Sequence, residues 1–368
     1  MLESADHSEL QARMITFLAQ TLLVLTSVAL TGSGTGANQA TAATPSWCAS
    51  PAASAAAEAL AAKFDDHQFV FIGSTHGDLK IEEFLMCLVS RPAFRQRVTD
   101  IVVEWASSGH QLLLDRYILT LDEVAVDDLA PIWLDTDTPT MWTTLPQVRR
   151  FVETLRQVNR TLPAAKRMRL VGGNDGVDWT KVRVPEDLAP YPFKTNFIPH
   201  LIMEHLAKAS GNRTLVVYGD GHIRYKGNNF MGDLEASLGR AKLFVVGRIG
   251  ELRADERAYL AAVGDPGRPF FVEARRFPTT IPWPPSLRIS MEERSERLAD
   301  YIDAFVYLGP EPDKDLTGSL PLSAGQQREL ARRASIMSDP QRTMRARYQG
   351  HDQWFRAHPD DVPPRPQR

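Results

Sequence analysis

The chain has 368 residues, 43% of them hydrophobic, and carries a formal net charge of -3 at neutral pH. This length and composition allow a large buried core, in one big domain or two modest ones. The small net charge argues against a nucleic-acid-binding polyelectrolyte. The one arginine-rich stretch, residues 328–347, has the pattern of the solvated face of a terminal helix.

The first recognisable segment is an apolar run over residues 14–30, which follows Arg13. It is short and rich in threonine for a membrane span, and Ala40-Thr41-Ala42 offers a cleavage site of the A-x-A type. We therefore expect a secretory signal peptide cleaved near Ala42, an exported protein (periplasmic or secreted), and no transmembrane helix in the mature chain. A buried core helix is the alternative interpretation of the run.

Short runs of β-branched and aromatic residues alternate with helical segments along the rest of the chain. The predicted strands are residues 68–73, 100–105, 167–172, 213–219, 241–247, 270–273 and 303–308. The predicted helices are residues 78–90, 110–119, 145–159, 195–209, 229–238 and 322–336. This alternation predicts an α/β fold with a mostly parallel central sheet flanked by helices.

We expect four parts along the chain. They are the signal peptide with an upstream extension (1–42), a linker with a short helix (43–63), the α/β domain (64–310) and a C-terminal helical tail (311–368). The two cysteines are Cys48 and Cys87. An oxidising compartment would permit a disulfide between them, although Cys87 could equally be a free buried residue.

Two segments share one plan, an apolar strand followed by glycine and then histidine. The first is F-V-F-I-G-S-T-H-G with His76, and the second is L-V-V-Y-G-D-G-H with His222. Open α/β sheets bind ligands beyond the carboxyl ends of their strands. If both strands run parallel in one sheet, we expect the two histidines to converge there. The alternative for each is an incidental histidine in a glycine-containing turn.

Acidic residues gather at the same predicted strand ends. Glu104 interrupts the apolar run I-V-V-E-W, and a buried carboxylate needs a donor, a cation or a metal because its burial is costly. Its alternative is a structural ion pair with a core arginine or a helix N-terminus. The other acids at predicted strand boundaries are Asp175, Asp178, Asp220 and Asp303.

Three motifs occur in a fixed order: F-I-G-S-T-H-G, V-V-E-W and Y-G-D-G-H-I-R. With the late D-A-F-V-Y-L-G, this set resembles the superfamily of erythromycin-esterase-like hydrolases, ChaN-type haem-binding lipoproteins and Tiki/TraB proteases. The resemblance implies an erythromycin-esterase-like/ChaN-like fold. One position departs from it, because Ser74 stands where the esterase-like members carry a glutamate. Glu82 and Glu83 in the next helix are the candidates to substitute for it.

The first functional hypothesis is an ester or amide hydrolase. His76 would act as general base oriented by Glu104, and His222 would polarise the carbonyl or protonate the leaving group. Asp220 or Asp175 would steer the water. In a metal-dependent variant, His76, His222 and Glu104 would form a ligand set for a divalent metal.

The second hypothesis is an exported haem-binding protein, which the resemblance to ChaN-type proteins suggests. Haem needs an accessible axial ligand, and Tyr218 or Tyr225 could assist a histidine there. The third is an α/β domain whose catalytic site has decayed, which Ser74 would explain. The expected partner is a small-molecule substrate or haem.

Overall fold

The structure, a computed structural model, describes residues 46–74, 79–137, 146–191, 197–209, 211–226, 230–249, 260–276, 298–309 and 322–347. His76 and the predicted signal peptide lie outside these residues. The described residues form two compact units. The larger unit takes residues 46–176 and 197–309, and the smaller unit takes residues 177–191 and 322–347.

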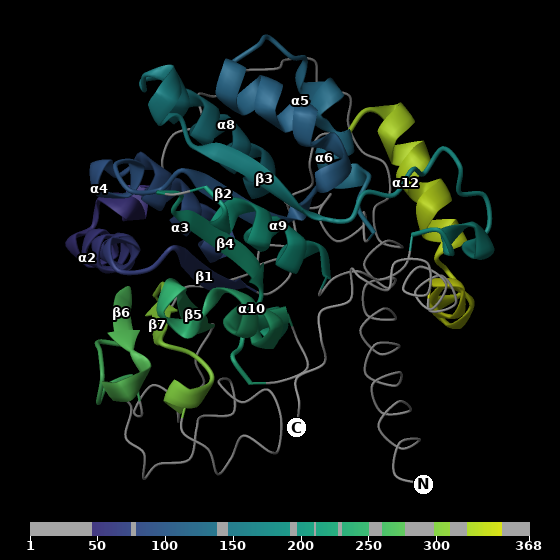
Figure 1. The fold of residues 1–368 in the computed structure, drawn as a ribbon. Coiled ribbons are helices and arrows are strands. Elements are labelled where there is room, and N and C mark those ends of the chain that lie inside the picture. Colours follow the sequence, from purple (N-terminus) through teal and green to yellow (C-terminus); the bar gives the residue numbers. More distant parts are fainter. Residues whose placement is uncertain are drawn as a thin grey trace, which may run out of the picture. The chain divides into compact units, whose positions relative to one another are not determined.

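The larger unit is built on a seven-stranded sheet in the order β3-β2-β4-β1-β5-β7-β6 among the described residues (Figure 1). Its strands are β1 (Phe69–Ser74), β2 (Asp100–Ser107), β3 (Arg169–Asn174), β4 (Thr214–Gly219), β5 (Leu243–Ile249), β6 (Phe270–Glu273) and β7 (Ala304–Tyr307). Every neighbouring pair is parallel except β6 with β7. The predicted α/β fold with a mostly parallel sheet is confirmed.

Helices alternate with these strands as the sequence pattern predicts. Those of the larger unit are α2 (Pro51–Ala61), α3 (Leu79–Ser90), α4 (Pro92–Arg95), α5 (Gln111–Asp115), α6 (Pro131–Leu134), α8 (Pro146–Arg160), α9 (Phe197–Ala207) and α10 (Phe230–Leu238). The smaller unit contains α12 (Ala324–Ile336). Most helices and strands begin and end within a few residues of the predicted positions. Apolar periodicity indicates that an element exists more reliably than it indicates where the element ends.

The predicted helix 110–119 differs from expectation. It begins at Gln111 and becomes a π-helical turn over Arg116–Thr120, which ends at Leu121 with a positive φ of 62°. Side chains of α8 satisfy the carbonyls of this turn. Arg156 donates to the carbonyl oxygens of Tyr117 and Leu121, and Asn159 donates to that of Ile118. These contacts compensate for the regular helical hydrogen bonds that the turn lacks.

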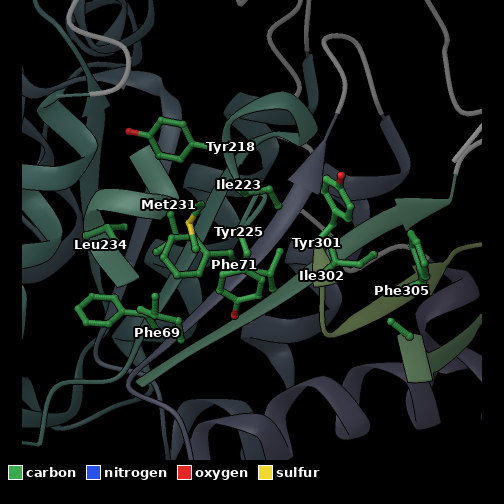
Figure 2. Packing of buried hydrophobic residues seen from close by; sticks show 14 of the residues in the cluster. Phe69, Phe71, Tyr218, Ile223, Tyr225, Met231, Leu234, Tyr301, Ile302 and Phe305 are labelled. Atoms are coloured by element: carbon green, nitrogen blue, oxygen red, sulfur yellow. The ribbon is translucent and has the colours of Figure 1, made fainter. Parts of the chain in front are cut away.

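Both faces of the central strands are buried, which is why their sequences are apolar throughout. Phe69 and Phe71 of β1 point to the face covered by α10, where they meet the cluster containing Met231 and Leu234 (Figure 2). On the opposite face, Trp105 of β2 packs edge-on against Phe151 of α8, with ring centroids 6.2 Å apart. Because helices cover both faces of the sheet, polar side chains are accommodated at the ends of the strands.

The described part of the region predicted as a linker contains an anchored segment. Cys48 and Cys87 form a disulfide with their Cα atoms 5.5 Å apart, so the option of a free Cys87 is excluded. Beside it, the Trp47 indole donates to the Glu83 carboxylate over 2.6 Å, and Arg91 donates to the Cys48 carbonyl. The N-terminal part of the larger unit is therefore tied to α3.

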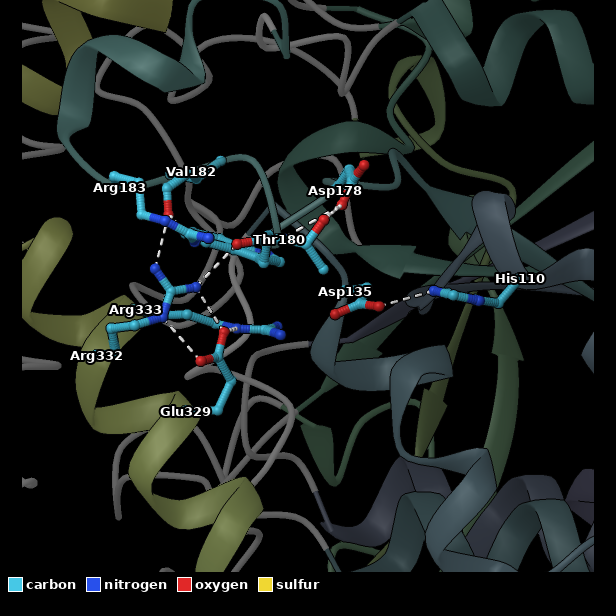
Figure 3. Close-up of polar contacts among 10 residues, drawn as sticks. His110, Asp135, Asp178, Thr180, Val182, Arg183, Glu329, Arg332 and Arg333 are labelled. Carbon is cyan, nitrogen blue, oxygen red and sulfur yellow. Dashed lines mark hydrogen bonds and ion pairs between the residues drawn. The ribbon is translucent and has the colours of Figure 1, made fainter.

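The smaller unit holds two arginines of α12 against its interior, Arg332 partly and Arg333 fully buried. Arg332 donates to the carbonyl oxygens of Val182 and Trp179, and the guanidinium of Arg333 lies 5.1 Å from the Trp179 ring centroid (Figure 3). Both arginines also bind Glu329, which lowers the pKa of that carboxyl to about 2. The expectation of a fully solvated arginine face is therefore wrong at Arg333, which is buried against an aromatic ring.

In the described part of the chain, no helix has the length and apolar composition that a membrane span requires.

Candidate functional site

The carboxyl ends of β1 and β4 lie side by side in the sheet. Ser74 pairs with Gly219 and Gly73 pairs with Tyr218 in the parallel register. The chain then turns through Asp220–His222 at the end of β4. His76 follows Ser74 by two residues and lies outside the described residues. The register therefore places Ser74 and Gly219, each within three residues of its histidine in the sequence, side by side at one edge.

Glu104 reaches this edge from β2 on the other side of β4. It is 8% exposed, and its Oε2 accepts a hydrogen bond from the Gly219 amide over 2.7 Å. Its Oε1 lies 3.8 Å from Nε2 of His222, whose side chain is 32% exposed. The structure therefore brings together two of the predicted site residues. Among the described residues no arginine pairs with Glu104, so the alternative of a core arginine partner is not supported.

The environment of Glu104 resists its ionisation. Burial raises its pKa above the usual 4.5, while the charge of His222 and the Gly219 amide oppose the rise. Asp137 is near enough to add a further increase in the pKa of Glu104. A positive charge on His222 thus stabilises the ionised form of Glu104.

This arrangement depends sterically on Gly73, whereas Gly219 leaves room for a Cβ at ordinary contact distance. A Cβ at Gly219 would stand 3.5 Å from Oε2 of Glu104 and 3.4 Å from Cδ2 of His222. A Cβ at Gly73 would overlap the carboxylate of Asp220. Asp220 therefore packs directly on β1, and its Oδ1 lies 3.5 Å from the Arg248 amide nitrogen of β5. This placement makes Asp220 an anchor of the turn that carries His222.

β3 lies next to β2 at the end of the strand order, and its carboxyl end belongs to the same edge. Thr136 forms an antiparallel bridge with Gly176, and the Asp137 amide donates to Oδ1 of Asn174 over 3.2 Å. Asp175 lies between these two contacts and helps to raise the pKa of the buried Tyr218 hydroxyl, after burial and Glu104. Sequence reasoning missed Asp137 and Asn174. Asn174 had a usable signal, since it ends a strand, whereas Asp137 follows a short helix and had none.

Other predicted candidates lie elsewhere. Asp178 belongs to the smaller unit, where Thr180 and Lys181 hold its pKa at about 2. Asp303 precedes β7 and accepts hydrogen bonds from Tyr225 over 2.6 Å and Arg240 over 2.9 Å. These two acids therefore have structural partners.

The residues considered as substitutes or as haem ligands are also engaged. Glu83 accepts the Trp47 hydrogen bond, and Glu82 is buried in the first turn of α3. The Tyr218 hydroxyl donates to the Gly173 carbonyl, and that of Tyr225 donates to Asp303. Both tyrosines are buried, so neither offers a hydroxyl to an external iron.

Within the described residues, no group of three or more His, Cys, Asp or Glu side chains is arranged to hold a metal ion. The predicted set of His76, His222 and Glu104 includes one residue outside that part of the chain. The described pair by itself supplies one imidazole and one carboxylate.

No family model and no curated protein matches the chain. Among solved structures, a succinoglycan biosynthesis protein is 12% identical with a TM-score of 0.43, covering 68% of this chain and 90% of that one. ChaN of Campylobacter jejuni, described with cofacial haem binding, is 13% identical with a TM-score of 0.34, covering 53% and 87%. The type III effector HopBA1 is 16% identical with a TM-score of 0.34, covering 53% and 83%.

These likenesses are too distant to carry an argument about function. The strand order and the parallel pairing establish the fold class from the chain itself. The protein is an α/β protein with a mostly parallel sheet, and a buried glutamate meets a partly exposed histidine at the carboxyl edge of that sheet.

Proposed function

We propose that this protein hydrolyses esters, with amides as the second substrate class, at the carboxyl edge of β1, β2 and β4. One observation carries the proposal: the buried carboxylate of Glu104 lies 3.8 Å from Nε2 of the partly exposed His222. A histidine that solvent can reach exchanges protons near neutral pH, and a fixed carboxylate orients it and stabilises its charged form.

In the proposed reaction, His222 takes a proton from a water molecule while the water oxygen bonds to the carbonyl carbon. Glu104 stabilises the imidazolium that results. Its Oε2 is fixed by the Gly219 amide, so the carboxylate needs little rearrangement when the charge develops. Collapse of the tetrahedral intermediate breaks the bond to the leaving group, which must receive a proton.

The contact between Glu104 and His222 favours a change in the roles predicted from the sequence. His222 becomes the base, and His76, two residues after β1 in the sequence, becomes the group that polarises the carbonyl oxygen. Asp220 holds the turn in place through its packing on Gly73. Asp175 remains the candidate for steering water, because it lies at the end of β3 on the same edge.

The proposal places the enzyme outside the cytoplasm, acting on a small molecule. The apolar run at residues 14–30 and the A-x-A sequence support export. The disulfide between Cys48 and Cys87 fits an oxidising compartment.

The direct test is turnover of an aryl ester, an alkyl ester and an anilide by the purified protein. We expect His222→Ala to lower kcat/KM for the hydrolysed substrates by about 100-fold or more. His67→Ala is the matched control, because His67 bonds the Ala241 carbonyl at the opposite edge of the sheet. Full turnover by His222→Ala, or none by the wild type, would refute the proposal.

A haem titration and a metal analysis of the same preparation address the other two hypotheses. We expect no stoichiometric metal and no haem absorption band that depends on His222. A haem band that His222→Ala abolishes, without ester turnover, would favour the binding protein. Turnover that chelators remove and a divalent metal restores would favour the metal-dependent enzyme.

A further inference from the structure

A second pair of histidine and carboxylate lies at the carboxyl edge of the sheet. His110 ends the short turn Ser108–His110 directly after β2, and Asp135 follows α6. We propose that His110, held by Asp135, delivers the proton to the leaving group. This inference rests on the proposed function and adds a catalytic residue to it.

The pair has the geometry of an oriented histidine. Nε2 of His110 lies 2.9 Å from Oδ2 of Asp135, and the two side chains are 31% and 23% exposed (Figure 3). No other described residue hydrogen-bonds the ring of His110. With Nε2 engaged by the carboxylate, Nδ1 is the nitrogen that can exchange a proton with a ligand.

One short segment connects this pair to the first one. Asp135 contacts His110, and the next residue, Thr136, is bridged to Gly176 at the end of β3. Asp137, one residue further, is bonded to Asn174 and close enough to Glu104 to raise its pKa. The segment 135–137 thus runs along the sheet edge from the His110 pair toward the Glu104 pair. Both pairs therefore lie at the carboxyl edge of the sheet.

Ser107, close to His110 in the sequence, is not placed to act as a nucleophile with His110 and Asp135. Ser107 is completely buried at the end of β2, and its hydroxyl has no hydrogen-bond partner among the described residues. Its Oγ lies 3.0 Å from the position that a Cβ at Gly176 would take, so the surrounding backbone covers it. A serine without access to substrate cannot attack a carbonyl. His110 consequently acts on substrate directly in our proposal.

Ester hydrolysis needs one proton removed and one supplied. His222 takes a proton from water as the new carbon–oxygen bond forms. The protonated His110 then gives its Nδ1 proton to the leaving oxygen as the old carbon–oxygen bond breaks. The products are a carboxylic acid and an alcohol. The proton left on His222 passes to solvent and His110 takes one up, so the cycle closes without a co-reactant.

This role predicts a dependence on the leaving group. An alkoxide needs a proton to depart, whereas 4-nitrophenolate departs unaided. We expect His110→Ala to lower kcat/KM for alkyl esters by about 100-fold and for 4-nitrophenyl esters by less than about threefold. Asp135→Asn should show the same selectivity with a smaller loss, and added imidazole should restore part of the alkyl ester rate. His67→Ala is again the control and should change neither rate.

The outcomes separate this inference from the proposed function. If the wild type hydrolyses neither ester class, the proposed function fails and this inference fails with it. If His222→Ala loses both activities but His110→Ala loses none, or loses both equally, only the inference is overturned. A loss confined to alkyl esters supports it.

Discussion

Charged side chains lie at both the amino and the carboxyl ends of the parallel strands, but the kinds of residue that form pairs differ between the two edges. At the amino edge, Arg169 binds Asp115 through two hydrogen bonds of 2.8 Å each, next to the start of β3. At the carboxyl edge, the described pairs include His222 with Glu104 and His110 with Asp135.

The two kinds of pair have different roles: an arginine pair fixes the structure, and a histidine pair can take part in a reaction. A guanidinium stays protonated at every physiological pH, so a pair such as Arg169 with Asp115 fixes α5 against β3 and exchanges no proton. An imidazole gains and loses its proton near neutrality, so a histidine pair can take part in a reaction. His67, a histidine at the amino edge, fits this contrast, because it is hydrogen-bonded to a backbone carbonyl rather than to an acid.

The largest effect that tests this contrast is expected from Glu104→Gln. The amide side chain keeps the volume of glutamate and an oxygen for the Gly219 amide, but it loses the charge that stabilises protonated His222. We expect kcat/KM for ester hydrolysis to fall by about 100-fold or more, with the fold retained. Steady-state kinetics and circular dichroism measure the two quantities.

Asp115→Asn is the matched control at the amino edge. It removes the charge that Arg169 binds and leaves the reactive pairs untouched. Its kcat/KM should stay within about twofold of the wild type. An equal loss in both variants would mean that the two edges do not differ in the way we describe.

The next effect concerns stability alone. The double substitution Cys48→Ser/Cys87→Ser removes a crosslink spanning 39 residues of sequence. The unfolded chain becomes freer, so the free energy of unfolding should fall by about 2–4 kcal/mol in urea titrations. Ester turnover at low temperature should persist, since the disulfide lies in the scaffold. Reduction of the wild type should reproduce the result, and unchanged stability would contradict it.

Gly73→Ala tests whether Asp220 anchors the turn Asp220–His222. Its methyl group would overlap the Asp220 carboxylate, so Asp220 and the turn carrying His222 must shift. We expect a loss of about 1–3 kcal/mol in stability together with at least about tenfold in kcat/KM. Gly221→Ala is the control in the same turn, because nothing lies within 4 Å of the added Cβ. Similar activity of the two variants would argue against the anchor.

The smallest effect is a change in the pH dependence of stability. Burial raises the pKa of Glu104 in the folded state above its ordinary 4.5. The folded state therefore holds this proton at pH values where the unfolded state has released it, so the stability falls as the pH rises through that interval. Glu104→Gln lacks this slope. Urea titrations should show the wild type losing stability relative to the variant above about pH 4.5; a relative gain would contradict the assignment.

The sequence predicted the fold well, because its signals are local. Each strand is an apolar run that ends at glycine or polar residues. Such a run can be recognised without knowing the order of the strands in the sheet. Glu104 was found for the same reason, since a carboxylate inside an apolar strand conflicts with its surroundings. The glycines before Asp220 and His222 marked the turn at the end of β4 in the same way.

The pairing of side chains could not be predicted, because it depends on strand order and register. Only the insertion of β4 between β2 and β1 brings Glu104 to His222. His110 and Asp135 are 25 positions apart, in a turn and after a short helix, and neither position carries a local signal. Asp137 was missed for the same reason.

The central claim is that Glu104 and His222 act as one unit, and a double-mutant cycle tests it most directly. Ester kcat/KM is measured for the wild type, Glu104→Gln, His222→Ala and the double variant. Residues of one unit are non-additive, so we predict that the double variant is no slower than His222→Ala alone. If the two losses multiply, the residues act independently and the account is contradicted.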